Sequence, residues 1–138
     1  DVGHGQMHPR LAGDLRVTNI EGLNARDLLR EHLGGKSISF VTSDVSFISL
    51  KLALPPALEF AEKGARCVLL VKPQFEAGRE AIGKGGLLRD ASLGPVIAQD
   101  LAGWLDNQPG WRSIGLLPSP VTGGDGNHEF LLGGVKDQ

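Results

Sequence analysis

The spacing of hydrophobic and polar positions divides the chain into alternating strands and helices. Short apolar or β-branched runs predict strands, and longer stretches that open at a capping residue or a proline and close at glycine predict helices. The expected strands span residues 16–20, 37–43, 66–71, 111–117 and 128–132. The expected helices span residues 24–33, 49–62 and 92–108, and residues 1–9 form a glycine-punctuated loop.

The order of these elements predicts the fold class. Strands alternate with helices as far as residue 117, which indicates an α/β protein with a doubly wound, mostly parallel sheet. Residues 122–127 lie between the last two strands and are too few and too rich in glycine for a helix, so a C-terminal antiparallel hairpin is expected at one edge of the sheet. At 138 residues, the chain has the length of a single domain, residues 1–138, with a core of its own.

Composition and charge narrow the classes of function. The net charge of −2 excludes a generally basic protein that coats nucleic acid, so any nucleic-acid contact must be local or made by another domain. The single cysteine, Cys67, lies in an apolar strand and cannot form an internal disulfide, which is compatible with a reducing cytoplasm. No apolar stretch reaches the ~20 residues of a membrane span, and the first residues do not have the pattern of a signal peptide. The histidine spacings do not indicate a metal site.

Three ionisable residues stand beside apolar strands, in positions where ligands bind. Asp44 and Lys72 directly follow the strands at 37–43 and 66–71, and Glu129 lies at the start of the last strand. In open α/β sheets, ligands bind beyond the carboxyl ends of the strands. If the last strand runs antiparallel, its start lies at the same edge, so Asp44, Lys72 and Glu129 can converge there. The alternative is three unrelated surface charges at strand ends.

A glycine-rich loop downstream of the third strand carries Arg79, Lys84 and Arg89. Residues 78–84 fit the start of a phosphate-binding loop, but Gly85 stands where a Ser or Thr must supply a magnesium ligand. A mobile basic lid is therefore favoured over a nucleotide-binding loop. Its cations contact phosphates or are merely solvated, and both interpretations remain open.

Four segments, in their order along the chain, carry a specific resemblance to a known family. They are residues 1–6 (DVGHGQ), 43–52 (SDVSFISLKL), 71–79 (VKPQFEAGR) and 126–132 (GNHEFLL). Together they resemble the TlyA family, whose members are named as hemolysins and as ribosomal RNA 2′-O-methyltransferases related to the FtsJ (RrmJ) enzymes. The resemblance extends over nearly the whole chain.

The resemblance implies a Rossmann-like methyltransferase fold and a Lys-Asp-Lys-Glu tetrad for ribose methylation. Asp44, Lys72 and Glu129 match three members of the tetrad, and the first lysine has no counterpart because in the family it lies upstream of the position of Asp1. A ribose 2′-hydroxyl is a poor nucleophile that must be aimed at the methyl group and relieved of its proton. Lys72 would orient it and either accept the proton or stabilise the developing alkoxide. Asp44 and Glu129 would hold Lys72 and the ribose.

The cofactor implied by the resemblance is S-adenosylmethionine. The positions that match its expected contacts are Asp1, for the ribose hydroxyls, Gly3 in the same motif, Asn24 near the adenine, and Asp44. The family's first strand and glycine-rich cofactor loop have no counterpart in the chain. We therefore expect a partial methyltransferase domain that lacks the first strand and binds the cofactor weakly or not at all. The strand at 37–43 is then expected to have one unpaired side, which pairs with another segment or with a second copy in a homodimer.

Three hypotheses of function follow. The first is a cytoplasmic ribosomal RNA 2′-O-methyltransferase domain, or a remnant of one, with Arg79, Lys84 and Arg89 contacting the RNA. The second is a non-catalytic module that binds RNA or a protein through the loop at 79–89. The third is a membrane-active hemolysin, as names in the family suggest, which the lack of a membrane span or of a strongly amphipathic cationic helix disfavours.

Overall fold

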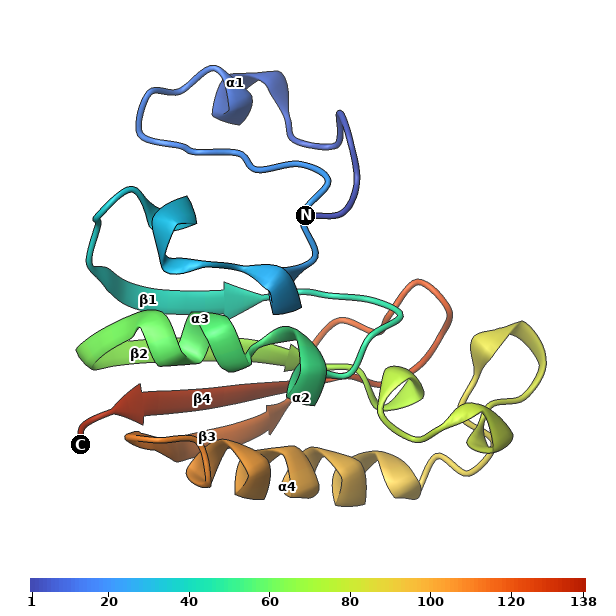
Figure 1. Ribbon diagram of the computed structural model, residues 1–138. Helices are drawn as coiled ribbons and strands as arrows, with labels where there is room; N and C mark the ends of the chain where they lie inside the picture. Colours follow the sequence, from blue (N-terminus) through green and yellow to red (C-terminus); the bar gives the residue numbers. More distant parts are fainter.

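One four-stranded sheet organises the protein, whose computed structural model describes all 138 residues. The strands are β1 (Ile38–Ser43), β2 (Ala61–Val71), β3 (Trp111–Pro118) and β4 (Phe130–Lys136), in the spatial order β1-β2-β4-β3 (Figure 1). β2 runs parallel to β1, and β4 runs antiparallel to both β2 and β3, so β1, β2 and β3 share one direction. The expected α/β fold, with a mostly parallel sheet and a C-terminal antiparallel hairpin, is therefore confirmed.

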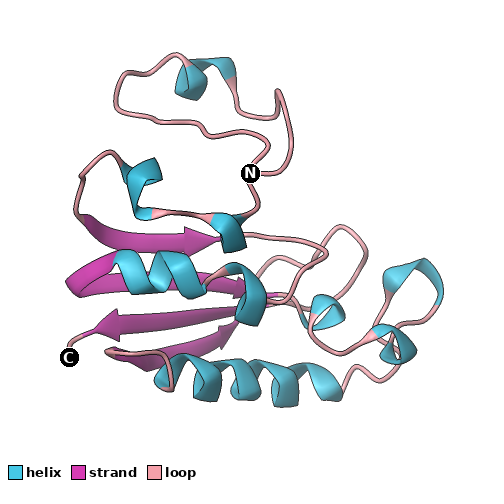
Figure 2. Cartoon of the chain, viewed as in Figure 1, coloured by secondary structure: helices cyan, strands magenta, loops and turns pink.

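Helices and short 3-10 turns connect the strands (Figure 2). The α-helices are α1 (Pro9–Ala12), α2 (Leu50–Ala53), α3 (Pro55–Phe60) and α4 (Leu93–Asp106). The 3-10 turns are η1 (Ala25–Asp27), η2 (Arg30–Leu33), η3 (Pro73–Phe75), η4 (Arg79–Ala81) and η5 (Lys84–Gly86). None of the helices combines the length and the apolar character that crossing a membrane requires.

The helices α2, α3 and α4 pack against the same face of the sheet. Their buried residues, Leu58 and Leu101 among them, join Leu69 and Leu132 of the central strands in one hydrophobic cluster. Val68 alternates with Leu69 along β2, so it points to the opposite face, where it stays 38% exposed. The expected doubly wound arrangement, with helices on both faces, is therefore not observed. The chain moves from β1 to β2 to β3 in one direction across the sheet, and right-handed crossovers then place all connecting helices on one face.

The strand expected at residues 16–20 does not form, and no other strand lies within residues 1–36. Strand residues need a neighbour for their backbone hydrogen bonds, and β1 is an edge strand that nothing pairs on its outer side. The segment therefore stays irregular beside the sheet. The unpaired outer side of β1 agrees with the expectation for that strand, and its pairing with a second copy stays a prediction.

The helix expected at residues 24–33 is replaced by the turns η1 and η2, which an extended backbone at Leu28 and Leu29 separates. The residues predicted to begin and end this helix nonetheless cap the two turns. The Asn24 side chain accepts a hydrogen bond from the backbone of η1, and Gly34 ends η2 with a positive φ of 60°. Leu29 stays exposed, so the segment lacks the continuous apolar face that would stabilise a longer helix.

The helix expected at residues 49–62 is shorter and divided. α2 and α3 are separate because proline fits the first turn of a helix but not its interior, and α3 therefore begins at Pro55. β2 begins at Ala61 rather than at residue 66, so the end of the predicted helix is a strand. Lys136 Nζ donates to three carbonyl oxygens at this boundary, that of Leu58 at 2.9 Å among them, and so caps the end of α3.

The glycine at position 134 lets α4 approach the sheet closely. A Cβ atom there would lie 2.7 Å from Leu105 Cδ2 and 3.0 Å from Cys67 Sγ. Cys67 is buried, as expected, and this burial raises the pKa of its thiol to about 11. The packing of α4 on β4 therefore depends on the absence of a side chain at Gly134.

We expect Gly134→Ala to lower the free energy of unfolding by about 1–3 kcal/mol, because an extra methyl group in a packed core forces its neighbours to shift. Gly133→Ala is the matched control, since a Cβ atom there meets nothing closer than 3.7 Å, at Ile114 Cγ1 on the open face. Urea denaturation of both variants measures the difference. Equal free energies of unfolding would show that α4 does not pack against β4 as described.

Candidate active site

The carboxyl ends of β1 and β2 and the start of β4 meet at one edge of the sheet (Figure 1). Asp44 directly follows β1, and Lys72 directly follows β2. Val71 pairs with Phe130 in the β2–β4 ladder, so Lys72 and Glu129 are the next residues outward on neighbouring strands. The topology thus places all three predicted residues at this edge, because two parallel strands end where an antiparallel strand begins.

The ammonium group of Lys72 is held at the centre of this edge. Its Nζ lies 2.6 Å from Asp44 Oδ1 and donates a hydrogen bond to Ser46 Oγ at 3.1 Å. The side chain of Lys72 is 13% exposed, whereas that of Asp44 is 73% exposed. The site therefore presents a shielded ammonium beside a carboxylate that solvent or a ligand can reach.

Glu129 is buried and forms no ion pair with Lys72. Its Oε2 accepts a hydrogen bond from Gln74 Nε2 at 3.2 Å, and the same nitrogen donates to Asp125 Oδ2 at 3.2 Å. The two N–H groups of the Gln74 amide thus hold two carboxylates, which fixes the orientation of the amide. Its other end, Oε1, is buried without a partner. The structure pairs Asp44 with Lys72 and leaves Glu129 bound to Gln74.

Glu76 joins the loop after β1 to the turn after β2. Its Oε1 accepts a hydrogen bond from Ser49 Oγ at 2.5 Å, and its Oε2 accepts one from Leu50 N at 2.9 Å, at the start of α2. Burial raises the pKa of Glu76, although these two hydrogen bonds act to lower it. The contact fixes the position of the loop that carries Asp44 relative to η3.

The raised pKa of Glu76 gives a testable pH dependence. A carboxyl group with a higher pKa in the folded state stabilises the fold at low pH, and that contribution is lost as the pH rises from the unfolded value of 4.5 through the folded pKa. We therefore expect Glu76→Gln to gain stability relative to the unsubstituted protein as the pH rises from about 4 to about 7. Urea denaturation across this range measures the difference. A difference that stays constant or falls with pH would contradict the prediction.

Phe47 combines an unusual backbone with an exposed ring. It is the one residue other than glycine with a positive φ, 63°, and it is 89% exposed. Its ring lies against that of Phe75, with 4.9 Å between the centroids. Backbone strain of this kind is concentrated at functional sites. An exposed aromatic surface therefore lies on the loop that Asp44 begins.

Three of the four residues expected to bind the cofactor, Asp1, Gly3 and Asn24, lie on the N-terminal segment, and the fourth, Asp44, directly follows β1. Asp1 Oδ1 accepts a hydrogen bond from Gly3 N at 2.7 Å, and Leu23 N donates to Asp1 O at 3.1 Å, which brings Asp1 next to the segment of Asn24. Asp1 Oδ2 and Asn24 Nδ2 have no hydrogen-bond partner in the chain. A free carboxylate oxygen accepts hydrogen bonds from hydroxyl groups, and a free amide nitrogen donates to ring nitrogens. The donor and acceptor set of these residues therefore fits a nucleoside such as that of S-adenosylmethionine.

The basic loop, residues 79–89, is built from η4 and η5 and closed by a bridge between Ile82 and Leu88. Single 3-10 turns replace the helix that follows a true phosphate-binding loop, so residues 78–84 are not one. The three cations of the loop are exposed and form no ion pair: Arg79, Lys84 and Arg89. Their contact with RNA stays a prediction. No group of three His, Cys, Asp or Glu side chains gathers as a metal site would require.

Sequence reasoning did not single out four residues that shape the site. They are Ser46, Phe47, Gln74 and Glu76. All four lie within the segments 43–52 and 71–79, on which the family resemblance rests. Their position inside those two specific segments was the available signal, but nothing in the local pattern shows which distant group each of the four residues contacts.

The chain matches known methyltransferases over almost its whole length. The family model described as FtsJ-like methyltransferase matches residues 1–136. The 16S/23S rRNA (cytidine-2′-O)-methyltransferase TlyA of Mycobacterium tuberculosis (strain CDC 1551 / Oshkosh) is 41% identical over 132 residues, which cover 96% of this chain and 48% of the relative. Hemolysin A of Brachyspira hyodysenteriae is 37% identical over 131 residues, which cover 95% of this chain and 54% of the relative.

A solved structure agrees with these sequence matches. The crystal structure of a candidate hemolysin from Lactococcus lactis matches with a TM-score of 0.89 and 40% identity, over 99% of this chain and 64% of the other. The chain spans about half the length of the curated relatives it matches. The resemblance that the four sequence segments indicate is confirmed.

Proposed function

The chain belongs to the FtsJ-like methyltransferase family, and we propose that residues 1–138 form a partial S-adenosylmethionine-dependent methyltransferase domain that acts on a ribose 2′-hydroxyl of ribosomal RNA. The observation that carries the proposal is the contact of 2.6 Å between Lys72 Nζ and Asp44 Oδ1 at the edge where β1 and β2 end. The TlyA relative, at 41% identity and named for methylation of a cytidine 2′-oxygen, supports the same chemistry. A ribosomal RNA substrate implies a cytoplasmic location.

Lys72 is the residue that acts on the ribose oxygen. An ammonium group has three N–H donors, and two of them are taken by Asp44 and Ser46. The third is free to bind the 2′-oxygen, to orient it and to stabilise the negative charge that develops there as the O–H bond breaks. Asp44 holds the lysine in place and, because its own side chain is exposed, connects the site with the solvent that takes up the proton.

Glu129 and the N-terminal segment position the two reactants. Glu129 Oε2 is held by Gln74, which leaves Oε1 to accept a hydrogen bond from a hydroxyl group of the substrate ribose. Asp1 and Asn24 would hold the ribose and the adenine of the cofactor. S-adenosylmethionine, when bound, supplies the methyl group as an electrophilic sulfonium.

The test of this function is transfer of a labelled methyl group from S-adenosylmethionine to ribosomal RNA by the full-length protein. We expect labelled RNA, and we expect its yield at low RNA concentration to fall steeply with salt, because cations such as Arg79, Lys84 and Arg89 lose affinity for phosphates as salt rises. RNA binding without methyl transfer would favour the non-catalytic module instead. The absence of both would contradict the proposal.

The exposed ring of Phe47 gives a separate prediction. We expect Phe47→Ala to raise the KM for RNA roughly 5- to 150-fold, because stacking of an unpaired base on an aromatic ring contributes about 1–3 kcal/mol. Phe47→Gly should lose the same affinity but be more stable than Phe47→Ala by about 1 kcal/mol, because glycine adopts a positive φ without strain. Steady-state kinetics and urea denaturation measure the two effects. An unchanged KM for RNA in both variants would exclude Phe47 from the binding surface.

A further inference from the structure

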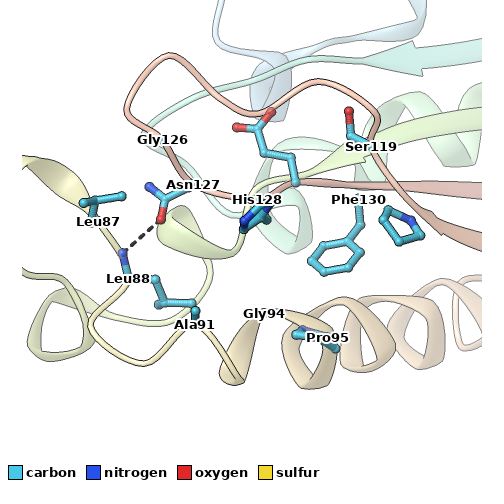
Figure 3. Close-up of a pocket in the computed structure, with 12 residues that line it drawn as sticks. Leu87, Leu88, Ala91, Gly94, Pro95, Ser119, Gly126, Asn127, His128 and Phe130 are labelled. Atoms are coloured by element: carbon cyan, nitrogen blue, oxygen red, sulfur yellow. Dashed lines mark hydrogen bonds between the residues drawn. The ribbon is translucent and has the colours of Figure 1, made fainter.

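The basic loop is hydrogen-bonded to the rest of the protein through one side chain, that of Asn127. Its Oδ1 accepts a hydrogen bond from Leu88 N at 2.9 Å, as Figure 3 shows, and its Nδ2 donates to Gly86 O at 2.9 Å. The other hydrogen bonds of residues 79–89 stay within the loop or reach the adjoining Gly78. None of the charged side chains of the loop forms an ion pair. Asn127 is therefore the polar anchor of the basic loop.

Packing against the neighbouring helix holds the loop only in part. A pocket of about 270 Å³ lies between the end of the loop, the start of α4 and the turn before β4 (Figure 3). Leu87 and Leu88 line the loop side of this pocket, and Gly94 and Pro95 line the helix side. Leu87 stays 44% exposed. Because the loop and the helix do not close on each other, the position of the loop depends strongly on the two hydrogen bonds of Asn127.

The side chain of Asn127 suits this role because an amide carries both a donor and an acceptor. Leu88 N requires an acceptor and Gly86 O requires a donor, so one orientation of the amide satisfies both groups. Asn127 is 6% exposed, and hydrogen bonds in such a shielded place are stronger than those in water. An aspartate at this position would lose the bond to Gly86 O, and an alanine would lose both bonds.

The same residue is fixed to the part of the site that carries Glu129. Asn127 N donates to Asp125 Oδ1 at 3.0 Å, and Gln74 Nε2 donates at 3.2 Å to both Asp125 Oδ2 and Glu129 Oε2. Asn127 and Glu129 are two residues apart just before β4, and both are buried, whereas His128 between them is exposed. Their side chains therefore share one side of the chain. One hydrogen-bond network thus extends from the basic loop to Glu129.

We propose that Asn127 is a positioning residue for methyl transfer, which holds the basic loop at a fixed place relative to Glu129 and so lets phosphate groups bound by the loop bring the ribose to Lys72. The inference rests on the proposed function. Phosphate contacts set the position and orientation of a nucleic acid on a protein, and loop cations such as Arg89 do so only if the loop itself is fixed. On a mobile loop, the same cations still attract RNA but no longer determine where the ribose lies.

A double-substitution cycle in full-length protein tests this role. Under single-turnover conditions, we expect Asn127→Ala to lower the maximal rate about 10- to 100-fold, because misplacing a reactant by about 1 Å has effects of this size. The RNA concentration that half-saturates the rate should change less than about threefold, since the cations that attract RNA remain. Arg89→Gln should lower the maximal rate roughly tenfold when Asn127 is present but less than about twofold in Asn127→Ala, because coupled residues have non-additive effects.

Asn107→Ala is the matched control. Asn107 is exposed at the end of α4 remote from the basic loop, where its Nδ2 donates to Gly103 O at 3.1 Å. We expect this substitution to leave the rate unchanged and to leave the effect of Arg89→Gln at its full size. Asn127→Asp repeats the cycle without a change of side-chain size, and it should cause a smaller loss because the acceptor for Leu88 N is kept.

NMR of the isotopically labelled protein tests the anchoring itself and needs no methyl transfer. We expect Asn127→Ala to speed hydrogen exchange of the Leu88 amide about tenfold or more, because its acceptor is lost. The order parameters of residues 79–89 should fall below about 0.6, the range of flexible backbone. Unchanged exchange in β4 would show that the variant is folded.

Two results would each overturn the proposal. One is an effect of Arg89→Gln on the maximal rate that is equally large with and without Asn127, since Asn127 would then contribute to stability alone. The other is a loop that stays as ordered in folded Asn127→Ala as in the unsubstituted protein. With methyl transfer by the unsubstituted protein, either result would leave the proposed function standing. Absence of that transfer would contradict the proposed function, even if Asn127→Ala frees the loop.

Discussion

Lys72→Met is expected to lower the rate of methyl transfer to ribosomal RNA by about 10²- to 10⁴-fold, the range observed for loss of an acid–base group or of a charge-stabilising donor. Methionine is similar to lysine in length, so packing beside β2 is kept while the ammonium group is lost. The matched control is Lys51→Met. Lys51 pairs with Asp100 at the same 2.6 Å, but on an exposed surface where an ion pair contributes little, so its loss should leave the rate unchanged.

Single-turnover kinetics of the full-length variants measures this effect, and urea denaturation shows whether each variant is folded. The loss should appear in the maximal single-turnover rate rather than in the RNA concentration that half-saturates it, because the ammonium stabilises charge that exists only in the transition state. Asp44→Asn should reduce the same parameter to a smaller extent, since an amide oxygen still accepts from Lys72 Nζ but carries no charge. A folded Lys72→Met variant with an unchanged rate would remove Lys72 from the chemistry.

The largest effect on stability is expected from Leu69→Ala, at about 2–5 kcal/mol. Leu69 is fully buried in the central strand β2, against the face that α2, α3 and α4 cover. Removing its side chain leaves a cavity that the surrounding core residues fill only in part. Because domains of this size are stable by only about 5–15 kcal/mol, the substitution would consume much of the stability of the fold.

Val68→Ala is the matched control for this prediction. Val68 is the preceding residue on the same strand, and its side chain points to the open face of the sheet. We expect its substitution to cost less than about 1 kcal/mol, as is usual for exposed positions without special contacts. Urea denaturation of both variants compares the two faces directly. Equal costs would show that the helices do not cover one face alone.

The parts of the fold that sequence predicts well are those with a strong local pattern. The apolar run that ends at Val71 and the β-branched run before Asp44 are strands, and the long helix before the last hairpin is present as α4. The failures lie where tertiary contacts decide. Residues 16–20 have strand-like composition but no neighbouring strand, and residues 24–33 have helix end signals but no continuous apolar face.

The candidate site likewise has residues that the sequence predicts and contacts that it does not. Asp44 and Lys72 could be predicted because strand ends and topology gather them at one edge. The partners that hold the site lie far apart in the chain: 26 residues separate Lys72 from Ser46, and 55 separate Gln74 from Glu129. No periodicity reports such contacts, since they arise only when the edges of the sheet are assembled. The orientation of Glu129 toward Gln74 rather than Lys72 is a result of this kind.

The most direct test of whether Lys72 promotes methylation of a ribose oxygen is mass spectrometry of the nucleosides of ribosomal RNA. The RNA is first treated with the full-length protein and S-adenosylmethionine, and its nucleosides are then released. The account predicts a nucleoside with its added methyl group on the ribose, formed by the unsubstituted protein and by Lys51→Met and missing with Lys72→Met. A methyl group on the base, or a ribose-methylated product that Lys72→Met forms as well, would contradict it.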